Sequence, residues 1–177
     1  MRRALSIISL SVLMTGFLFA FTDVKVGAED LTPDQSAQIK ANCVSIKNSV
    51  SQLHASDALL RVNRGQTYEA VAGKLMDPFN SRLASNQLDN RAMTAVTSDY
   101  RTSLDAFRND YIAYEQKLSA TLRIDCTAKP NSFHASLVEA RELRAKVHAD
   151  VLRLHQLLDD YHSSVSDFLL NYERVSQ

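Results

Sequence analysis

The sequence predicts an all-α protein, an elongated antiparallel three-helix bundle over residues 29–177 that follows a signal peptide or membrane anchor over residues 1–28. Two observations lead to this prediction. Apolar residues recur at alternating steps of three and four along three long stretches, which is typical of helices packed along a seam. Glycine and proline are scarce, 4 and 3 in 177 residues, and together with polar clusters they separate these stretches. No stretch shows the apolar alternation of a strand, so the predicted fold class is purely helical.

An export signal is predicted at the N-terminus. Arg2 and Arg3 precede an unbroken apolar run over residues 4–21, and a cationic start followed by such a run directs a chain across a membrane. The small-x-small motif at residues 26–28 would allow signal peptidase to release residues 29–177. A run of about 18 apolar residues is also long enough to stay as an anchor. In both cases we expect the bundle on the outer side of the membrane, secreted or anchored, because the arginines hold the N-terminus inside.

The charge of the chain argues against nucleic-acid binding. The full sequence has 20 basic and 20 acidic residues, and removal of residues 1–28 leaves 17 basic and 19 acidic ones. Nucleic-acid binding requires a basic face, whereas a weakly acidic surface of mixed sign is the ordinary pattern of a soluble helical protein. We therefore expect no nucleic-acid partner.

The first helix is expected to begin after Thr32 and to end at a polar turn in the middle of the chain. Thr32, Pro33 at the first helical position and Gln35 at the third form a capping box. Pro78, which follows Asp77, either kinks this helix or begins a new one behind an Asp77 cap. The predicted seam of this helix consists of Ile39, Cys43, Ile46, Val50, Leu53, Leu60, Tyr68, Val71, Leu75 and Met76.

A polar turn at residues 86–90 separates the first helix from the second, and a segment from Cys126 to Asn131 separates the second from the third. Pro130 disfavours helix at the residue before it, so Asn131 or Ser132 is expected to cap the third helix. With about 45 residues, that helix would be ~67 Å long. The second seam consists of Met93, Val96, Tyr100, Leu104, Phe107, Tyr111, Tyr114, Leu118 and Leu122. The third consists of Leu137, Ala140, Arg144, Val147, Val151, Leu154, Leu158, Tyr161, Val165, Phe168, Tyr172 and Val175.

The two cysteines are predicted to form a disulfide. Facing residues of an antiparallel hairpin have numbers with a constant sum, so Cys43 and Cys126 place the centre of the turn between residues 84 and 85, next to the turn at residues 86–90. A bridge between these helices is sterically reasonable, and a loop of this length implies a stabilisation of up to ~4.5 kcal/mol. Two unpaired buried thiols are the alternative. The bridge is expected at the membrane-proximal end of the bundle, and the turn and the C-terminus at the far end.

Three short stretches carry a resemblance to a known group of proteins. They are RVNRGQ at residues 61–66, FNSR at residues 79–82 and IDC at residues 124–126. These stretches resemble segments of small, uncharacterised exported helical-bundle proteins of ultra-small candidate-phylum bacteria, and the resemblance covers most of residues 40–170. It implies the helical fold and the exported location, and it implies no activity.

The histidines of the third helix do not predict a metal site. His148, His155 and His162 recur every seven residues, about 10.5 Å apart along the helix, which is too far for one ion. Asp159 has the spacing of a second ligand with His155 and with His162. However, the Glu-x-x-His motifs of a di-iron bundle do not occur in the sequence. We therefore expect neither a metal nor a cofactor.

Catalytic residues are not predicted either, because the nucleophile-elbow, dinucleotide-binding and P-loop motifs do not occur in the sequence. Aromatic residues at seam positions can line a ligand pocket between helices, but this spacing favours core. Arg144, at a seam position, can pair with a carboxylate or extend to solvent. The seam aromatics are Tyr100, Phe107, Tyr111, Tyr114, Tyr161, Phe168 and Tyr172.

The segment over residues 61–86 has the weakest seam and is the predicted surface for a partner. A solvated, irregular helix is the alternative for this segment. The candidate contact residues are Arg61, Asn63, Arg64, Asn80 and Arg82. We expect an exported, disulfide-linked, non-enzymatic bundle that serves as an envelope-associated interaction or structural module with an unknown protein partner. The alternative function is a periplasmic or extracellular bundle that binds a small ligand or a metal.

Overall fold

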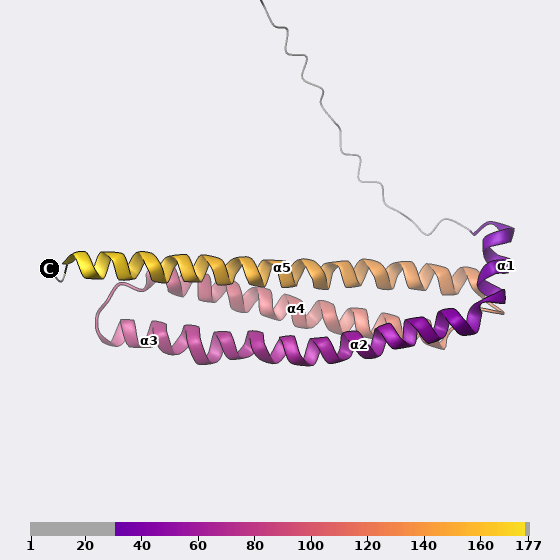
Figure 1. The fold of residues 1–177 in the computed structure, drawn as a ribbon, viewed down its shortest axis with the longest axis horizontal. Coiled ribbons are helices and arrows are strands. Elements are labelled where there is room, and N and C mark those ends of the chain that lie inside the picture. The colour runs from indigo at the N-terminus through magenta and orange to yellow at the C-terminus, as the bar shows by residue number, and fades with distance from the viewer. Residues whose placement is uncertain (1–30, 176–177) are drawn as a thin grey trace, which may run out of the picture.

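The computed structural model describes residues 31–175, and these residues are helical without any strand (Figure 1). The predicted all-α class is therefore confirmed. The helices are α1 (Pro33–Ala41), α2 (Cys43–Ala70), the π-helical segment η1 (Val71–Met76), α3 (Asp77–Ser85), α4 (Arg91–Arg123) and α5 (Pro130–Val175). The predicted signal peptide or anchor over residues 1–28 lies outside the described residues. Within the described part of the chain, no helix is both long and apolar enough to cross a bilayer.

The long helices lie side by side in an elongated molecule. Segments α2, η1 and α3 follow one another as a single rod, which runs antiparallel to α4, and α5 returns along α4 (Figure 1). At 46 residues, α5 is the longest helix and extends for about 69 Å. The C-terminal end of α5 and the α3–α4 connection lie at one end of the molecule, whereas α1 and the α4–α5 connection lie at the other (Figure 1).

The Cys43–Cys126 disulfide joins the start of α2 to the end of α4, with the two Cα atoms 5.6 Å apart. This separation lies in the range that a disulfide requires. Cys126 is fully buried and Cys43 is 8% exposed, and both pack against Phe133 at the start of α5. The predicted pairing and the antiparallel register derived from it are confirmed.

The first predicted helix is interrupted at Asn42. The capping box is present, because the Gln35 N–H donates to Thr32 Oγ1 over 3.3 Å and the Thr32 N–H donates to Gln35 Oε1 over 2.9 Å. At Asn42, however, the backbone leaves the helical region (φ −105°, ψ 13°) and Nδ2 donates to the Gln38 carbonyl. Asparagine side chains compete with the backbone for such carbonyls, which weakens a helix. As a result α1 turns across the end of the bundle (Figure 1).

A π-helical turn precedes Pro78 in place of a helix start. Asp77 has helical torsions (φ −62°, ψ −48°), and its N–H donates to the Ala72 carbonyl, five residues earlier. The predicted Asp77 cap is therefore wrong, and the helix continues. Proline has no N–H and its ring clashes with the carbonyl four residues before it in a regular helix. The wider π turn over η1 accommodates the ring without ending the helix.

The start of α5 also differs from the prediction. The helix begins with Pro130 at its first position, and the Lys129 carbonyl accepts from the Phe133 N–H over 3.0 Å. Asp125 Oδ1 accepts from the N–H groups of Thr127 and Ala128 over 2.9 and 3.1 Å, which folds the connection into a tight turn. Proline at this position lacks the N–H that would otherwise have no partner within the helix. Because the helix begins at Pro130, Asn131 and Ser132 lie inside it and neither is its cap.

The core forms three clusters along the molecule. The first surrounds the disulfide, and the second and third lie on either side of the middle of α2. The second contains Val50, Tyr111, Tyr114, Leu118 and Ala140, and the third contains Tyr68, Ala72, Met76, Tyr100, Leu104, Phe107, Leu154 and Leu157. Between them, the predicted seam of α2 is wrong: Leu53 and Leu60 are 38% and 53% exposed. The α2 residues that face α4 and α5 in this interval are polar or small.

Candidate functional site

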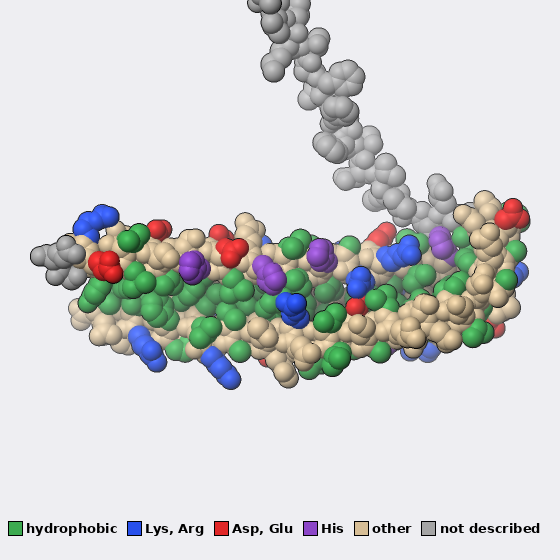
Figure 2. Space-filling view, viewed as in Figure 1, with side chains coloured by type: hydrophobic (Ala, Val, Ile, Leu, Met, Phe, Trp, Pro, Cys, Tyr) green, Lys and Arg blue, Asp and Glu red, His purple; other side chains and the backbone are tan. Residues whose placement is uncertain are grey.

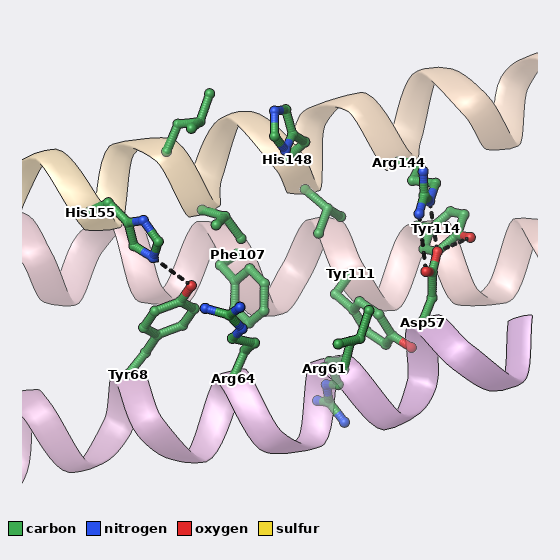
Figure 3. A pocket seen from close by; sticks show the side chains of 14 residues that line it. Asp57, Arg61, Arg64, Tyr68, Phe107, Tyr111, Tyr114, Arg144, His148 and His155 are labelled. Atoms are coloured by element: carbon green, nitrogen blue, oxygen red, sulfur yellow. Dashed lines mark hydrogen bonds and ion pairs between the residues drawn. The ribbon is translucent and has the colours of Figure 1, made fainter. Parts of the chain in front are cut away.

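The stretch of α2 between Val50 and Tyr68, whose inward-facing residues are polar or small, is called the polar interval. A pocket lies where this polar interval faces α5, with α4 behind it. It is open to solvent and has a volume of about 440 Å³. Figure 2 shows a band of hydrophobic side chains between α5 and the α2–α3 rod, with histidines on its α5 side. We call this space the α2–α5 pocket. It is lined by Asp57, Leu60, Arg61, Arg64 and Tyr68 of α2, by Phe107, Tyr111 and Tyr114 of α4, and by Arg144, Val147, His148, Val151, Leu152 and His155 of α5 (Figure 3).

An ion pair closes the end of the pocket nearer the disulfide. Arg144 donates from Nε and Nη2 to the two carboxylate oxygens of Asp57, over 2.7 and 3.1 Å, and the Tyr114 hydroxyl donates to Asp57 Oδ2 over 2.7 Å (Figure 3). Burial alone would raise the pKa of Asp57, but the bonds from Arg144 and Tyr114 outweigh it and hold that pKa below its usual value. Asp57 is therefore ionised at neutral pH. Burial and the Asp57 carboxylate raise the pKa of Tyr114, which keeps it a hydrogen-bond donor.

A tyrosine and a histidine form the opposite end of the pocket. The Tyr68 hydroxyl and His155 Nε2 are 3.1 Å apart (Figure 3). The Tyr68 ring meets the Phe107 ring edge to face, with centroids 5.7 Å apart. The Tyr100 hydroxyl donates to the Tyr68 carbonyl over 3.2 Å, and burial raises the pKa of Tyr100 to about 12. These contacts fix the position of the Tyr68 side chain, because its ring, hydroxyl and backbone are each held by a different residue.

The middle of the pocket is basic. Arg61 lies over the Tyr111 ring at 5.0 Å from the centroid, a cation–π contact. Arg64 points into the pocket toward Phe107 (Figure 3), and among residues 31–175 it has no acidic partner. Gly65 follows it, and a Cβ there would be 3.9 Å from the Phe107 ring. Because Gly65 has no side chain, nothing from this position fills the space between α2 and Phe107.

The structure separates the five residues predicted as partner contacts. Arg61 and Arg64 line the α2–α5 pocket, and Asn63 is exposed on the same helix. Arg82 is exposed on α3, 18 positions beyond Arg64 and so about 27 Å farther along the rod. Arg82 and the predicted contact residues of α2 therefore do not form one surface.

Asn80 has a structural position. It is 8% exposed, its Nδ2 donates to Thr97 Oγ1 over 2.8 Å, and its Oδ1 accepts from the Tyr161 hydroxyl over 3.0 Å. Its carbonyl accepts from Asn90 Nδ2 over 2.9 Å. Asn80 thus ties α3 to α4, to α5 and to the α3–α4 connection, and its side chain is not accessible to a partner.

The remaining sequence candidates lie in the core, in the pocket or at the surface: Tyr161 and Phe168 are half-buried, and the predicted core position of Tyr172 is wrong, because it is 52% exposed. Tyr100 and Tyr114 are core, as the spacing indicated, while Phe107, Tyr111 and Tyr114 also form the floor of the pocket. His148 and His155 line its α5 wall. No group of three or more histidine, cysteine, aspartate or glutamate side chains within the described residues is arranged to hold a metal ion.

The polar members of the pocket were not all identified from the sequence. Arg144 was singled out for its seam position, and its pairing with a carboxylate is confirmed. Asp57 was missed, although a signal was present. Between Val50 and Tyr68, the positions that recur every 3.6 residues and face inward carry polar or small residues. The apolar residues Leu53 and Leu60 do not have this spacing, and they are exposed.

The chain was also compared with known proteins. No protein-family model, no curated protein and no solved structure matches it. The resemblance to exported helical-bundle proteins therefore stays a prediction, and the function must be argued from the pocket and the fold.

Proposed function

We propose that the chain is an exported, non-enzymatic, disulfide-stabilised helical bundle that holds a small ligand in the α2–α5 pocket. The pocket is the observation that carries this proposal. Its volume lies in the range of ligand sites, and its apolar lining with a few convergent polar groups is their usual composition. Two functions were considered from the sequence: an envelope-associated interaction or structural module, and a bundle that binds a small ligand or a metal. The pocket favours the binding of a small ligand.

The exported location in this proposal is supported by the disulfide. Disulfides persist in oxidising compartments and are rare in the cytosol. The Cys43–Cys126 bond is consistent with export by the apolar segment at residues 4–21, whether that segment is removed or kept as an anchor. Non-reducing peptide mapping of the protein from its own envelope should recover the linked pair, and free thiols at both positions would contradict export.

Native mass spectrometry tests the proposed ligand binding. The full-length protein is incubated with a small-molecule extract of the cells that produce it, and the bound mass is measured. Leu152→Trp introduces a large ring at the pocket wall, where Leu152 is 56% exposed and can be replaced without disturbing the core. Leu169→Trp makes the same change at a 49% exposed position outside the pocket. We expect a bound small molecule on the wild type and on Leu169→Trp and its loss from Leu152→Trp, whereas a wild type without any adduct would contradict the proposal.

Contact with an envelope protein is the second candidate function. The C-terminal part of α5 exposes Leu169, Leu170 and Tyr172, which are 49%, 61% and 52% exposed, and exposed apolar groups of this kind can mark interaction sites. A photo-reactive cross-linker placed at Arg82 or Tyr172 in intact cells tests this candidate. Recovery of one defined partner from either position, with no cross-link from exposed Arg141 as the control, would support it.

A further inference from the structure

We propose that the ligand of the α2–α5 pocket is an amphiphilic carboxylate, a single unbranched hydrocarbon chain that ends in one carboxylate group. This inference rests on the proposed function, because it names the chemical class that the pocket would hold. Three features of the pocket carry it: exposed apolar side chains on both walls, an arginine without an acidic partner, and the length of the space along α2.

The walls of the pocket leave apolar surface in contact with water. Leu60 on α2 is 53% exposed and Leu152 on α5 is 56% exposed, and both line the pocket. Val147 and Val151 line it on the same side as Leu152, and Phe107 forms the floor. A hydrocarbon chain between these walls would remove this surface from water, which favours binding in proportion to the apolar area covered. A purely polar ligand would leave it exposed.

The charge of the pocket determines which sign of charge the polar group of the ligand should carry. Three arginines and one aspartate line it, so two positive charges are in excess. Arg144 already pairs with Asp57, and Arg61 rests on the Tyr111 ring. Arg64 lies seven residues from Asp57 on α2, about 10.5 Å along the helix, and that carboxylate is occupied by its other partners. The Arg64 guanidinium therefore has its donors available for an incoming anion.

A carboxylate matches these donors in geometry and charge. The planar guanidinium presents paired N–H groups that match the two oxygens of a carboxylate. Arg64 points into the pocket (Figure 3), and His148 and His155 line the facing wall. A cationic head group would instead meet two uncompensated guanidinium charges, which disfavours it in a partly desolvated space.

The pocket is long enough for one chain. It follows α2 from Asp57 to Tyr68, about 16 Å at 1.5 Å per residue, and Arg64 lies about 10.5 Å from its Asp57 end. A chain whose carboxylate binds Arg64 therefore has room for about eight extended carbons toward Asp57, and the rest of a longer chain would extend along the exposed Leu60 and Leu152. The Asp57–Arg144 pair closes one end and the Tyr68–His155 pair closes the other. We therefore take dodecanoate as the probe.

Isothermal titration calorimetry on the full-length, oxidised protein tests the inference, with each amphiphile kept below its micelle concentration. The probes are dodecanoate, dodecyltrimethylammonium with the same chain and the opposite charge, and acetate as the head group alone. We expect dodecanoate to bind one molecule per chain, the cation to bind at least tenfold more weakly, and acetate to give no measurable binding. Equal affinity for the cation would overturn the anion selectivity and leave an unselective apolar pocket.

Two pairs of variants locate the interaction. Arg64→Gln should weaken dodecanoate binding at least tenfold, and Arg141→Gln, at an exposed position of α5 outside the pocket, should not change it. Leu152→Glu should weaken dodecanoate at least tenfold by adding a negative charge at the wall, whereas Leu169→Glu should not. Circular dichroism melts confirm that each variant is folded. Equal losses in Arg64→Gln and Arg141→Gln would overturn the role of Arg64.

The failure of this inference differs from the failure of the proposed function. If the wild type carries a small molecule in native mass spectrometry but binds dodecanoate no better than the cation, the pocket holds a ligand of another class, and only the inference is wrong. If the protein shows neither an adduct nor any heat with the amphiphiles, both are wrong.

Discussion

The hydrogen bonds to Asp57 give a quantitative prediction about what holds the pocket together. Asp57→Ala removes one bond from Tyr114, which is 2% exposed, and two bonds from Arg144, whose side chain is 51% exposed. A buried bond to a charged group contributes about 1.5–3 kcal/mol. The pair with half-exposed Arg144 contributes up to about 1 kcal/mol, because water replaces much of it. We therefore expect Asp57→Ala to reduce the free energy of unfolding by about 2–4 kcal/mol.

Urea unfolding followed by circular dichroism measures this loss, with Asp105→Ala as the matched control. Asp105 also pairs with an arginine, Arg108 at 2.6 Å, but its side chain is 66% exposed, so its loss should be below about 0.5 kcal/mol. The double-mutant cycle with Tyr114→Phe should show coupling of about 1 kcal/mol or more, since the two residues are in direct contact. Equal effects of Asp57→Ala and Asp105→Ala, or additive effects in the cycle, would refute the reasoning.

The same bonds predict how stability depends on pH. The pKa of Asp57 is lower in the folded protein than its ordinary value, which is about 3.9 in unfolded chains. The stabilisation is therefore complete above that value and is lost as the pH falls through the lower, folded pKa. The difference in unfolding free energy between the wild type and Asp57→Asn should be constant from pH 5 to pH 7 and should shrink below about pH 4. A difference that grows in acid would mean that the carboxylate is not held by these bonds.

Three further predictions concern the rest of the bundle. Replacement of both disulfide cysteines by alanine removes a link between residues 83 positions apart. In urea unfolding, it should reduce the free energy of unfolding by up to about 4.5 kcal/mol. A loss below about 1 kcal/mol would contradict the stabilising role of the disulfide. Leu154→Ala, at a fully buried position, should cost about 2–5 kcal/mol of unfolding free energy. Glu139→Ala, at a 57% exposed residue that pairs with Lys117, should cost no more than about 0.5 kcal/mol, and similar costs at the two positions would refute the assigned core. Asp150 has a buried Oδ2, and burial, the negative charge of Asp110 and a hydrogen bond between the two carboxyl groups raise its pKa. The folded state thus favours the protonated form of Asp150. Asp150→Asn should therefore raise the free energy of unfolding by about 1 kcal/mol at pH 7. Thermal melts at pH 7 and pH 4 should show that this gain disappears in acid.

The sequence predicted the parts of the fold that depend on apolar spacing and covalent constraint. The apolar residues of the α4 seam were placed correctly, because residues such as Tyr100, Leu104 and Leu118 are buried, although the buried threonines Thr97 and Thr121 were not predicted. The register was correct because two cysteines admit one pairing, and the turn at residues 86–90 agreed with it. Both inferences rest on strong signals: a large apolar area that must be buried, and a bond of fixed length.

The sequence failed where polar residues occupy inward positions. A strict heptad drifts relative to a straight helix of 3.6 residues per turn, so the apolar residues Leu53 and Leu60 leave the seam of α2 while Asp57 enters it. Asn80 was assigned to the partner surface because the segment over residues 61–86 has the weakest seam, but Thr97 and other polar partners inside the bundle offset the cost of its burial. Such partners lie in segments far apart in the sequence, and a single sequence does not show which polar residues will contact each other in the fold.

The position of the pocket between two apolar clusters explains how the bundle tolerates it. On one side of the polar interval, Val50 packs with Tyr111 and Tyr114, and on the other side Tyr68 and Met76 pack into the third cluster. Because α2 is held on both sides, the interval between them can carry Asp57, Arg61, Arg64 and Gly65 without the helix separating from α4. Polar residues at inward positions cost stability, and the disulfide at the end of α2 offsets part of this cost by restricting the unfolded chain. Because the bond acts on the unfolded chain, its reduction should lower the free energy of unfolding by about the same amount in the wild type and in a variant whose polar interval is replaced by apolar residues. The reduced wild type should nevertheless unfold at a lower urea concentration than the reduced variant, because it has less packing energy, and a clearly larger loss in the apolar variant would contradict this account.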